Sequence, residues 1–244
     1  FMNRDQCLEY AVGSVGAVLG EAFAPADSYP TRVRLPDEPL MLVDRIVEVH
    51  GEPLSMTSGS LITEHDVLPG AWYLDGGRIP TCIAVEAGQA DLFLSGWLGI
   101  DLETRGEAVY RLLDAVVTFH GELPVVGDTI RYDIRIDHFF RQGETWLFRF
   151  GFEATVNGRL LMTMEDGCAG FFSQEALDAG QGILVRGLDQ RPDVRSLPDD
   201  WRALAPMELC ALDDAQMEAL RQGDLAGAFG PTFAGLPVTR PLTV

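Results

Sequence analysis

Apolar and polar positions alternate along the middle of the chain in a pattern typical of β-strands. Residues 40–49 and 56–63 predict two strands, and four longer β-rich stretches follow at 108–121, 128–137, 145–156 and 159–173. The boundaries between these four are turn signals: Pro124 with Gly127–Asp128, Gln142–Gly143 and Asn157–Gly158. Asn-Gly is the strongest hairpin signal in the chain. The pattern therefore predicts an antiparallel sheet of about six strands that are joined mostly by hairpins.

One long stretch has the period of a helix instead. Residues 81–98 place Ile83, Leu94 and Trp97 on an apolar stripe, whereas alanines and glycines fill several of the other positions. Side chains this small allow a sheet to curl closely around the helix. We therefore expect an α+β hot-dog fold, in which an antiparallel sheet wraps around one long central helix, with helical N- and C-terminal extensions.

Two amphipathic segments near the ends of the chain resemble each other. Residues 5–20 predict a helix that ends at Gly20, and residues 215–234 repeat the pattern of 5–24 at a constant spacing. The coinciding pairs are Gln6/Gln216, Gly13/Gly223, Gly20/Gly230, Phe23/Phe233 and Ala24/Ala234. One interpretation is a chance likeness of two amphipathic helices. The other is a module of about 200 residues that repeats within a longer protein.

These patterns divide the chain into three parts. Residues 1–29 form a helical lead-in or linker, and residues 30–175 form the hot-dog domain. Residues 176–244 begin with a Pro- and Arg-containing linker and end with the helical lead-in to a following module.

The composition removes several classes of function. A formal net charge of −19 does not favour nucleic acid or an anionic membrane as a partner. All 18 basic residues are arginine, so no lysine is present for a phosphate loop, a Schiff base or a pyridoxal anchor. Four dispersed cysteines without a CxxC motif predict reduced thiols in the cytoplasm and no metal site. We expect neither a signal peptide nor a membrane span.

Several motifs resemble the dehydratase region of bacterial polyunsaturated fatty acid synthases and related polyketide-like lipid synthases. They are LPDEPLMLVDRIVEV, TEHDV, WYLDGGRIP, VEAGQADLFLSGWLGID and VYRLLDAVVTFHGELPVVGDTIRYDIRID. That region is similar to the 3-hydroxydecanoyl-acyl-carrier-protein dehydratase/isomerase family. The resemblance covers about residues 30–175 and implies two hot-dog units that share a sheet, with the chemistry at their interface.

The resemblance also implies the substrate and the partners. The substrate is a 3-hydroxyacyl thioester carried on the phosphopantetheine of acyl carrier protein, and no separate cofactor or metal is expected. Partners are acyl carrier protein and an adjacent hot-dog module of the same synthase, in a homodimer or pseudo-dimer. Arg32, Arg34, Arg105 and Arg111 are candidates for docking the acidic carrier protein; the alternative is that they are solvated surface residues.

The family's motif places the reaction between Trp72 and Gln89. In the family a proline introduces the central helix, an acid lies about two turns into it, and a glutamine follows one turn later. Pro80, Glu86 and Gln89 match these positions. The family's catalytic histidine falls at Trp72, so the base is missing here. We expect a neighbouring hot dog to supply it.

Dehydration needs a base for the proton next to the thioester carbonyl and an acid for the leaving hydroxyl. Glu86 is the candidate acid, with a pKa raised by burial; the alternative is a surface carboxylate that meets solvent or Arg78. Backbone N–H groups of Thr81 and Cys82, which follow Pro80 at the first helical position, are candidates to bind the thioester oxygen. Gln89 either holds Glu86 or the substrate, or stabilises packing.

Two histidines and Trp72 have alternative interpretations. His65 and His120 are the candidate substitutes for the missing base. The alternative for His65 is a position in a surface turn. His120 lies at the end of a strand, and it either faces a pocket or does not. Trp72 either plugs the vacated pocket or anchors two hot dogs, with its indole N–H bound to a carbonyl. Three functions follow: a dehydratase unit, a non-catalytic pseudo-dehydratase that shapes the complex, and an acyl thioesterase.

Overall fold

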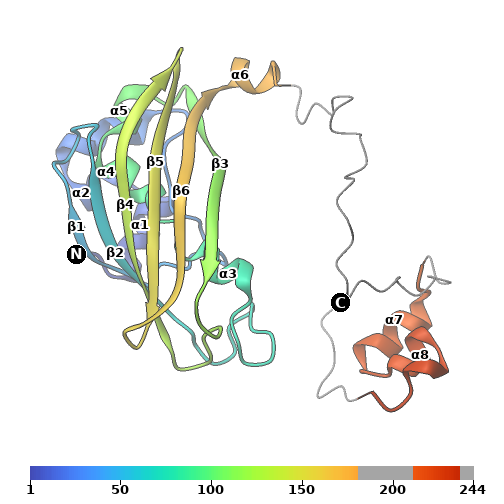
Figure 1. Cartoon of the computed structure of the whole chain (residues 1–244). Coiled ribbons are helices and arrows are strands. Elements are labelled where there is room, and N and C mark those ends of the chain that lie inside the picture. Colours follow the sequence, from blue (N-terminus) through green and yellow to red (C-terminus); the bar gives the residue numbers. More distant parts are fainter. Residues whose placement is uncertain (181–210, 237–244) are drawn as a thin grey trace, which may run out of the picture. The chain divides into compact units, whose positions relative to one another are not determined.

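The computed structural model describes residues 1–180 and 211–236. The chain divides into two compact units, Phe1–Gly180 and Gln181–Val244. The first unit contains the sheet and the helices that cover it, and the second contains the repeat of the lead-in (Figure 1). Most of the linker predicted within residues 176–244 lies outside the described residues.

The first unit is built on a six-stranded antiparallel sheet with the strand order β1-β2-β4-β5-β6-β3. The strands are β1 (Arg45–His50), β2 (Gly59–Asp66), β3 (Ala108–Phe119), β4 (Thr129–Gln142), β5 (Thr145–Val156) and β6 (Arg159–Ser173). β1 and β3 form the two edges, so the sheet is open. The predicted α+β hot-dog fold is confirmed.

Alternating side chains decide which face of the sheet is covered. Along β4, Ile130, Tyr132, Ile134 and Ile136 are buried, whereas the arginines and aspartates between them face outward. The β5–β6 hairpin turns at Asn157 and Gly158, which have φ values of 52° and 74°. Positive φ at both central residues is the geometry that the Asn-Gly pair predicts.

Most of the helices of this unit lie behind the strands in Figure 1, on the buried face of the sheet. They are α1 (Arg4–Val12), α2 (Val15–Leu19), η1 (Glu21–Ser28), α3 (Thr81–Glu86), α4 (Asp91–Trp97) and α5 (Ile100–Thr104), with α6 (Gln174–Asp178) after the last strand. α4 packs against β2 and β4. The central helical segment is thus interrupted between Glu86 and Asp91, where the sequence predicts one continuous helix.

Two residues of the sheet contact the chain where the helix is interrupted. The Tyr132 hydroxyl donates a hydrogen bond of 2.6 Å to the carbonyl of Ala84, which a continuous helix would bond to the N–H of Gly88. The N–H of Gly88 bonds instead to the carbonyl of Val85, at 3.0 Å. A Cβ at Gly88 would lie 2.7 Å from the ring of Phe152, so this close approach requires glycine.

The N-terminal lead-in packs on α4 and completes the same core. Phe23 stacks on Trp97 with a centroid distance of 5.5 Å, and Tyr10 meets Phe93 edge-on at 4.9 Å. The predicted helix over residues 5–20 consists of two helices, because Ser14 caps a new one, α2, by accepting from the N–H of Ala17.

Within the second unit, the described residues form three short helices. They are α7 (Asp214–Arg221), α8 (Leu225–Phe229) and η2 (Pro231–Phe233). In the two described stretches of the chain, no helix combines the length and the apolar character needed to cross a bilayer.

Candidate functional site

Glu86 is the last residue of α3, and its carboxyl is half-buried. Burial raises the pKa of this carboxyl above its ordinary value, which favours the protonated form. Arg78, the alternative partner, is exposed, and the ion pairs of the described residues do not include Glu86. The geometry therefore agrees with a desolvated acid rather than with a paired surface carboxylate.

A second carboxyl beside Glu86 is one that the sequence reasoning missed. Asp91, the first residue of α4, is fully buried, and the Tyr110 hydroxyl of β3 lies 3.2 Å from its Oδ2 atom as donor. Its Oδ1 atom has no hydrogen-bond partner among the described residues. Burial raises the pKa of Asp91 to about 7, and the Glu86 carboxylate adds to the rise against the opposing bond from Tyr110.

The interruption of the helix sets the position of Asp91 relative to Glu86. The residues between Glu86 and Asp91 turn the chain, so that Asp91 starts a new helix under β3. Burial raises the pKa of Tyr110 strongly, and the carboxylates of Asp91 and Glu86 raise it further. Tyr110 therefore keeps its proton and donates a hydrogen bond to Asp91. The signal available in the sequence was an aspartate flanked by the apolar residues Ala90 and Leu92.

The first turn of α3 differs from the prediction in one respect. Pro80 is the N-cap of α3, not its first helical residue, with φ −67° and ψ 154°. Its carbonyl accepts the N–H of Ala84 at 3.0 Å. Thr81 and Cys82 occupy the first turn and are exposed. Gln89 lies in the turn between α3 and α4, where its backbone N–H donates to the carbonyl of Glu86 at 3.0 Å.

His65 is not in a surface turn, so that interpretation is wrong. It lies in β2 with only 4% of its surface exposed. Its Nδ1 atom is 3.0 Å from the carboxylate of Asp44, and its Nε2 atom is 2.8 Å from the hydroxyl of Tyr73. Burial and the Asp44 and Asp66 carboxylates raise the pKa of Tyr73. Tyr73 therefore keeps its proton, and both ring nitrogens of His65 are engaged in hydrogen bonds.

The Asp44 carboxylate holds this network together. Burial opposes its charge, but hydrogen bonds from His65 and from the N–H of Asp66 outweigh that effect and lower the pKa of Asp44. Arg4 adds an ion pair to the same carboxylate. Asp44 is thus ionised at neutral pH, and it fixes the Nδ1–H form of His65.

Trp72 lies outside the core, with 58% of its surface exposed. Its indole N–H donates to the carbonyl of Pro39 at 3.0 Å, and its ring meets Tyr73 edge-on at 5.6 Å. Together with His65 and Tyr73 it lines a cavity of about 210 Å³. The predicted bond of the indole to a carbonyl is present within this unit.

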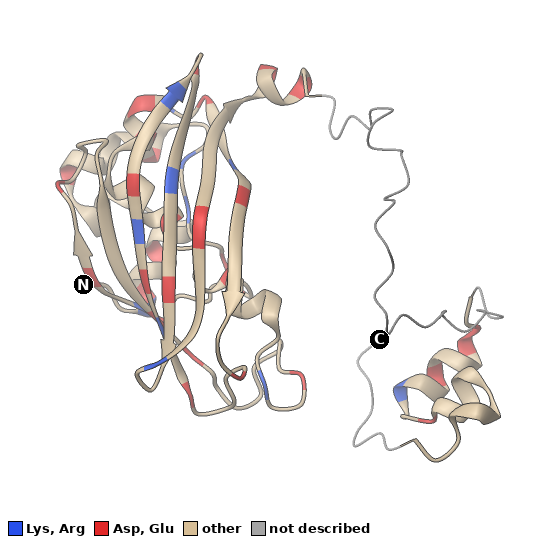
Figure 2. Ribbon diagram, in the orientation of Figure 1, with Lys and Arg blue, Asp and Glu red and all other residues tan. Residues whose placement is uncertain are grey.

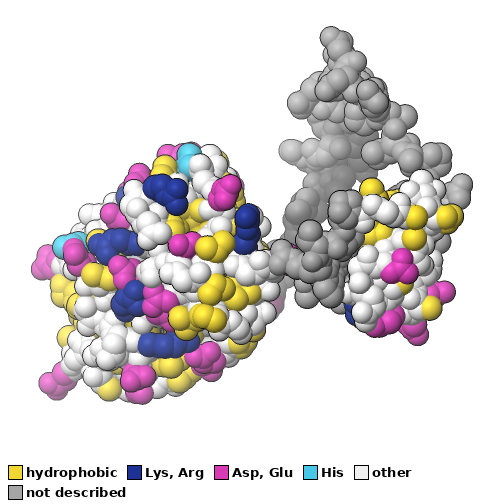
Figure 3. Space-filling view, turned by 90° about the horizontal axis from the view of Figure 1, so that it is seen from below, with side chains coloured by type: hydrophobic (Ala, Val, Ile, Leu, Met, Phe, Trp, Pro, Cys, Tyr) yellow, Lys and Arg dark blue, Asp and Glu magenta, His cyan; other side chains and the backbone are white. Residues whose placement is uncertain are grey.

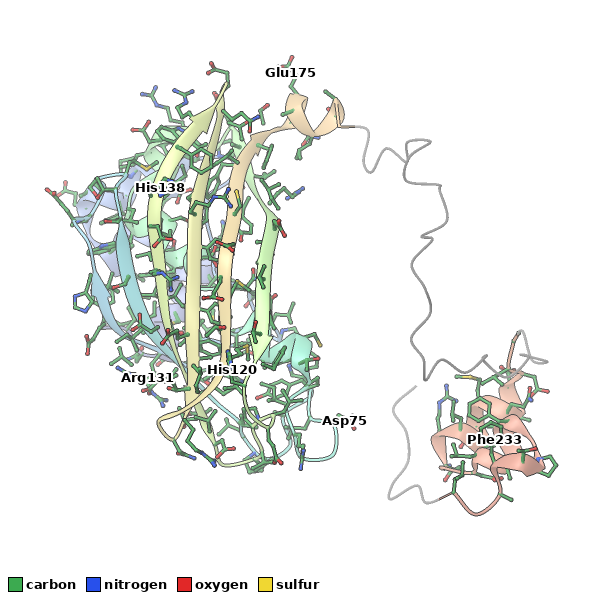
Figure 4. The ribbon with its side chains drawn as sticks, viewed as in Figure 1. Asp75, His120, Arg131, His138, Glu175 and Phe233 are labelled. Carbon is green, nitrogen blue, oxygen red and sulfur yellow. The ribbon has the colours of Figure 1, made fainter. Side chains whose placement is uncertain are left out.

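His120 follows the end of β3 and lines a cavity of about 490 Å³, so it does face a pocket. Figure 4 shows it at the lower end of that strand. Its Nε2 atom is 3.1 Å from the Thr163 hydroxyl. Leu160 and Leu161 from the β5–β6 hairpin region form part of the apolar lining.

The edge strand β3 carries an unusual amount of exposed apolar surface. Its exposed large side chains are Leu112, Leu113, Val116 and Phe119. They follow Tyr110, the residue that contacts the Asp91 carboxyl. An open edge with apolar side chains on it is a surface on which a further strand or domain can pair.

The candidate docking arginines divide into two kinds. Arg32 is buried and donates to the carbonyls of Tyr10 and Gly13, and Arg34 donates to the carbonyl of Ala11. Both therefore contact the C-terminal end of α1. Because Arg32 is buried, the docking assignment is wrong for that residue, whereas Arg34 is exposed and its docking role stays a prediction. Arg105 and Arg111 are exposed.

Acidic residues are spread over the first unit, with fewer basic ones between them (Figure 2). At its lower end arginines and acids alternate in Figure 3. Arg45 pairs there with Glu64 and Asp66, and Arg131 also contacts Glu64. These arginines are largely neutralised, so this end of the fold is not a free basic surface.

Residues 35–165 match the FabA-like domain family, and the chain belongs to that family. It is 38% identical over 234 residues to a polyunsaturated fatty acid synthase polypeptide of Thraustochytrium sp. (strain ATCC 26185 / S-3). That alignment covers 93% of this chain but only 16% of the relative. The resemblance drawn from the motifs is confirmed.

Solved structures give a weaker likeness. The ApeI:P dehydratase heterocomplex of Xenorhabdus doucetiae matches with a TM-score of 0.41 and 19% identity, covering 63% of this chain and 95% of that chain. A hypothetical thioesterase with coenzyme A from Streptococcus pneumoniae TIGR4 matches with a TM-score of 0.35 and 12% identity, covering 55% and 90%. At these scores the likeness carries no information about chemistry.

Proposed function

We propose that this chain is a dehydratase-type hot-dog domain of a lipid synthase, which acts on 3-hydroxyacyl thioesters of acyl carrier protein. The observation that carries the proposal is the desolvated Glu86 carboxyl, six residues after Pro80 and beside the buried Asp91. Membership of the FabA-like family and the similarity to a polyunsaturated fatty acid synthase polypeptide support it.

In this proposal Glu86 supplies a proton at the reacting centre. Dehydration breaks the bond between C3 and the hydroxyl oxygen, and a base takes the proton from C2, so that a 2-enoyl thioester and water result. Glu86 in its protonated form donates to the leaving hydroxyl. Burial raises the pKa of Glu86 above its ordinary value, which favours this protonated form. The backbone N–H groups of Thr81 and Cys82 stay predictions for the thioester oxygen, and Gln89 for a substrate contact.

The base comes from a second hot dog in this proposal. Both ring nitrogens of His65 are engaged by Asp44 and Tyr73, so this imidazole is not free to accept a substrate proton. The apolar open edge at β3 is where a second hot-dog unit would pair. Because Tyr110 in that strand contacts Asp91, pairing there brings the neighbour close to the carboxyl pair.

One specific observation favours the second candidate, a pseudo-dehydratase that only completes the assembly. Trp72, to which the resemblance assigns the family's histidine position, is held on the surface by a hydrogen bond to the Pro39 carbonyl. With Trp72 there, this unit contributes no base of its own. It would then shape the acyl channel of a neighbouring catalytic unit.

The experiment is Glu86→Gln in the intact synthase, with formation of the 2-enoyl thioester from a 3-hydroxyacyl thioester as the readout. Glu103→Gln, an exposed acid in α5, is the matched control. Loss of dehydration at least tenfold in the Glu86 variant alone supports the dehydratase role. Unchanged dehydration in both variants supports the pseudo-dehydratase. Release of free acid instead of enoyl product assigns a thioesterase.

Carrier-protein docking rests in this proposal on Arg105 and Arg111. Both are exposed on a chain of net charge −19, so attraction to another acidic protein must be local. Binding of acyl carrier protein should weaken as salt rises, and Arg111→Gln should flatten that dependence. A salt-independent affinity in the parent chain would refute an arginine contact.

A further inference from the structure

The second unit repeats the fold of the lead-in, position by position. Asn3 caps α1 in a reciprocal capping box with Gln6, and Asp213 caps α7 in the same box with Gln216. The bond from the N–H of Gln6 to Asn3 is 3.0 Å, and that from Gln216 to Asp213 is 2.8 Å. The reciprocal cap thus occurs at the same position in both copies.

The second helices of the two copies also agree. Ser14 caps α2 and Asp224 caps α8, each by accepting from the N–H three residues on. Gly20 ends α2 with φ 101° and ψ 174°, and Gly230 ends α8 with φ 103° and ψ 171°. The chain therefore turns in the same way before Phe23 and before Phe233.

The two copies differ in what covers their apolar residues. In the lead-in, Phe23 is only 6% exposed, because it stacks on Trp97 of α4. In the second unit, Phe233 is 39% exposed and the neighbouring Phe229 is 37% exposed. Figure 4 shows Phe233 on the helical unit of residues 211–236. The fold of the motif is thus complete, but its aromatic face has no counterpart to Trp97 among the described residues.

We infer that residues 211–236 are a docking element for the central helix of another hot-dog domain. The lead-in of this chain gives the geometry: Phe233 takes the place of Phe23 on an aromatic ring. Leu220, at the position of Tyr10, is already buried at 8% exposure, so the contact rests on the exposed Phe233. The partner therefore presents an aromatic side chain on its helix at the position that Trp97 has here. This inference does not depend on the proposed chemistry at Glu86.

The residues that change between the copies define the partner further. Tyr10 makes a close contact with Gly96 of α4, and Leu220 lacks the hydroxyl that comes within reach of that glycine. Ala11 is buried at 2% exposure, whereas Arg221 is exposed. The partner surface is thus aromatic at one end and open or acidic opposite Arg221. A second copy of this chain fits less well, because its own lead-in already covers α4.

The test is to exchange one copy for the other in the full chain. Residues 1–26 are replaced by a second copy of residues 211–236, once unchanged and once with Arg221→Ala in the graft to restore the small buried residue. We expect at least one graft to unfold cooperatively, with a midpoint within about 10 °C of the parent chain. Phe233→Asp in the graft should lower the midpoint by more than about 10 °C, and Ala215→Asp, at an exposed position of α7, should not.

The opposite results overturn the inference. If neither graft unfolds cooperatively, the second unit is not a hot-dog docking element. If Phe233→Asp and Ala215→Asp shift the graft equally, its aromatic face does not make the contact. A second measurement on the ungrafted chain is sedimentation velocity. Self-association that Phe233→Asp abolishes and Ala215→Asp preserves would assign the face to a second copy of this chain and overturn the choice of partner.

Discussion

The Tyr132 hydroxyl donates to the Ala84 carbonyl at 2.6 Å, in the last turn of α3. It joins a strand in the middle of the sheet to the central helical segment. The N–H of Gly88 loses its usual acceptor and turns back to Val85. The turn that follows sets the position of Asp91 relative to Glu86, so one tyrosine from the sheet shapes the candidate site.

The first prediction compares two buried tyrosines. Tyr132→Phe should lower the free energy of unfolding by about 1–2 kcal/mol, because a buried hydrogen bond is lost. Tyr10→Phe is the control, since the Tyr10 hydroxyl is buried without a hydrogen-bond partner among the described residues. Its removal should leave the stability unchanged or raise it. Urea denaturation measures both, and equal losses would contradict the role given to Tyr132.

The second prediction concerns pH and Asp91. The folded chain holds the Asp91 proton up to about pH 7, whereas the unfolded chain releases it near 3.8. Between these values the folded state binds more protons, so stability falls as pH rises through this window. The gap corresponds to at most about 4 kcal/mol.

Asp91→Asn removes this dependence while it keeps the shape of the side chain. Free energies of unfolding at pH 5 and pH 8 should differ less in the variant than in the parent, with the variant the more stable at pH 8. Asp101 also has a pKa raised by burial, to about 6, so some dependence remains. Asp101→Asn is therefore the matched comparison: it should remove only the part of the pH dependence that comes from Asp101 and leave the part that comes from Asp91. Parallel curves for parent and Asp91→Asn would refute the buried proton.

The third prediction tests whether Glu86 and Asp91 interact. The Glu86 carboxylate contributes to the raised pKa of Asp91. Glu86→Gln should therefore lower the pKa of Asp91 and move the pH window of stability loss downward. Carboxyl carbon NMR of Asp91 measures this pKa directly. Glu103→Gln should leave it in place, and an unchanged Asp91 titration in Glu86→Gln would show that the two groups are independent.

The fourth prediction concerns the arginine that holds the lead-in. Arg32 reaches two carbonyls at the end of α1, at 2.9 Å and 2.6 Å. Lysine cannot hold both in a planar fork, so Arg32→Lys should destabilise the chain by about 2 kcal/mol. Arg111→Lys, at an exposed position on β3, should cost less than about 0.5 kcal/mol. Equal losses of thermal stability in the two variants would contradict the role of Arg32 in holding the end of α1.

Much of the fold was predictable because its signals are local. The alternation in residues 145–156 and 159–173 gives β5 and β6 with their observed bounds. Asn157–Gly158 marks the hairpin between them by its backbone preference alone. The repeat of the lead-in was visible in the same way, since Gln6 and Gln216 are part of a cap that each segment forms within itself.

The candidate site was only partly predictable. Glu86 was assigned through the resemblance, which implies an acid about two turns after Pro80, and it is desolvated as expected. The surface-turn interpretation of His65 was wrong, because the residues around TEHDV do not indicate that Asp44 and Tyr73 contact and bury this histidine. Asp91 was missed for the same reason: an aspartate next to apolar residues does not indicate a buried carboxyl unless the contact with Tyr110 is known.

By itself, the sequence determined the strands, their turns and the two capped lead-ins, because backbone preference and alternation act within a few residues. Only the tertiary structure decided where the central helix breaks, since the residues in contact with the break, Tyr132 at the Ala84 carbonyl and Phe152 at Gly88, come from strands far along the chain. It also decided which carboxyl is buried, since desolvation depends on neighbours that distant segments bring. Local segments thus fixed the scaffold, whereas long-range packing set the protonation of the groups it carries.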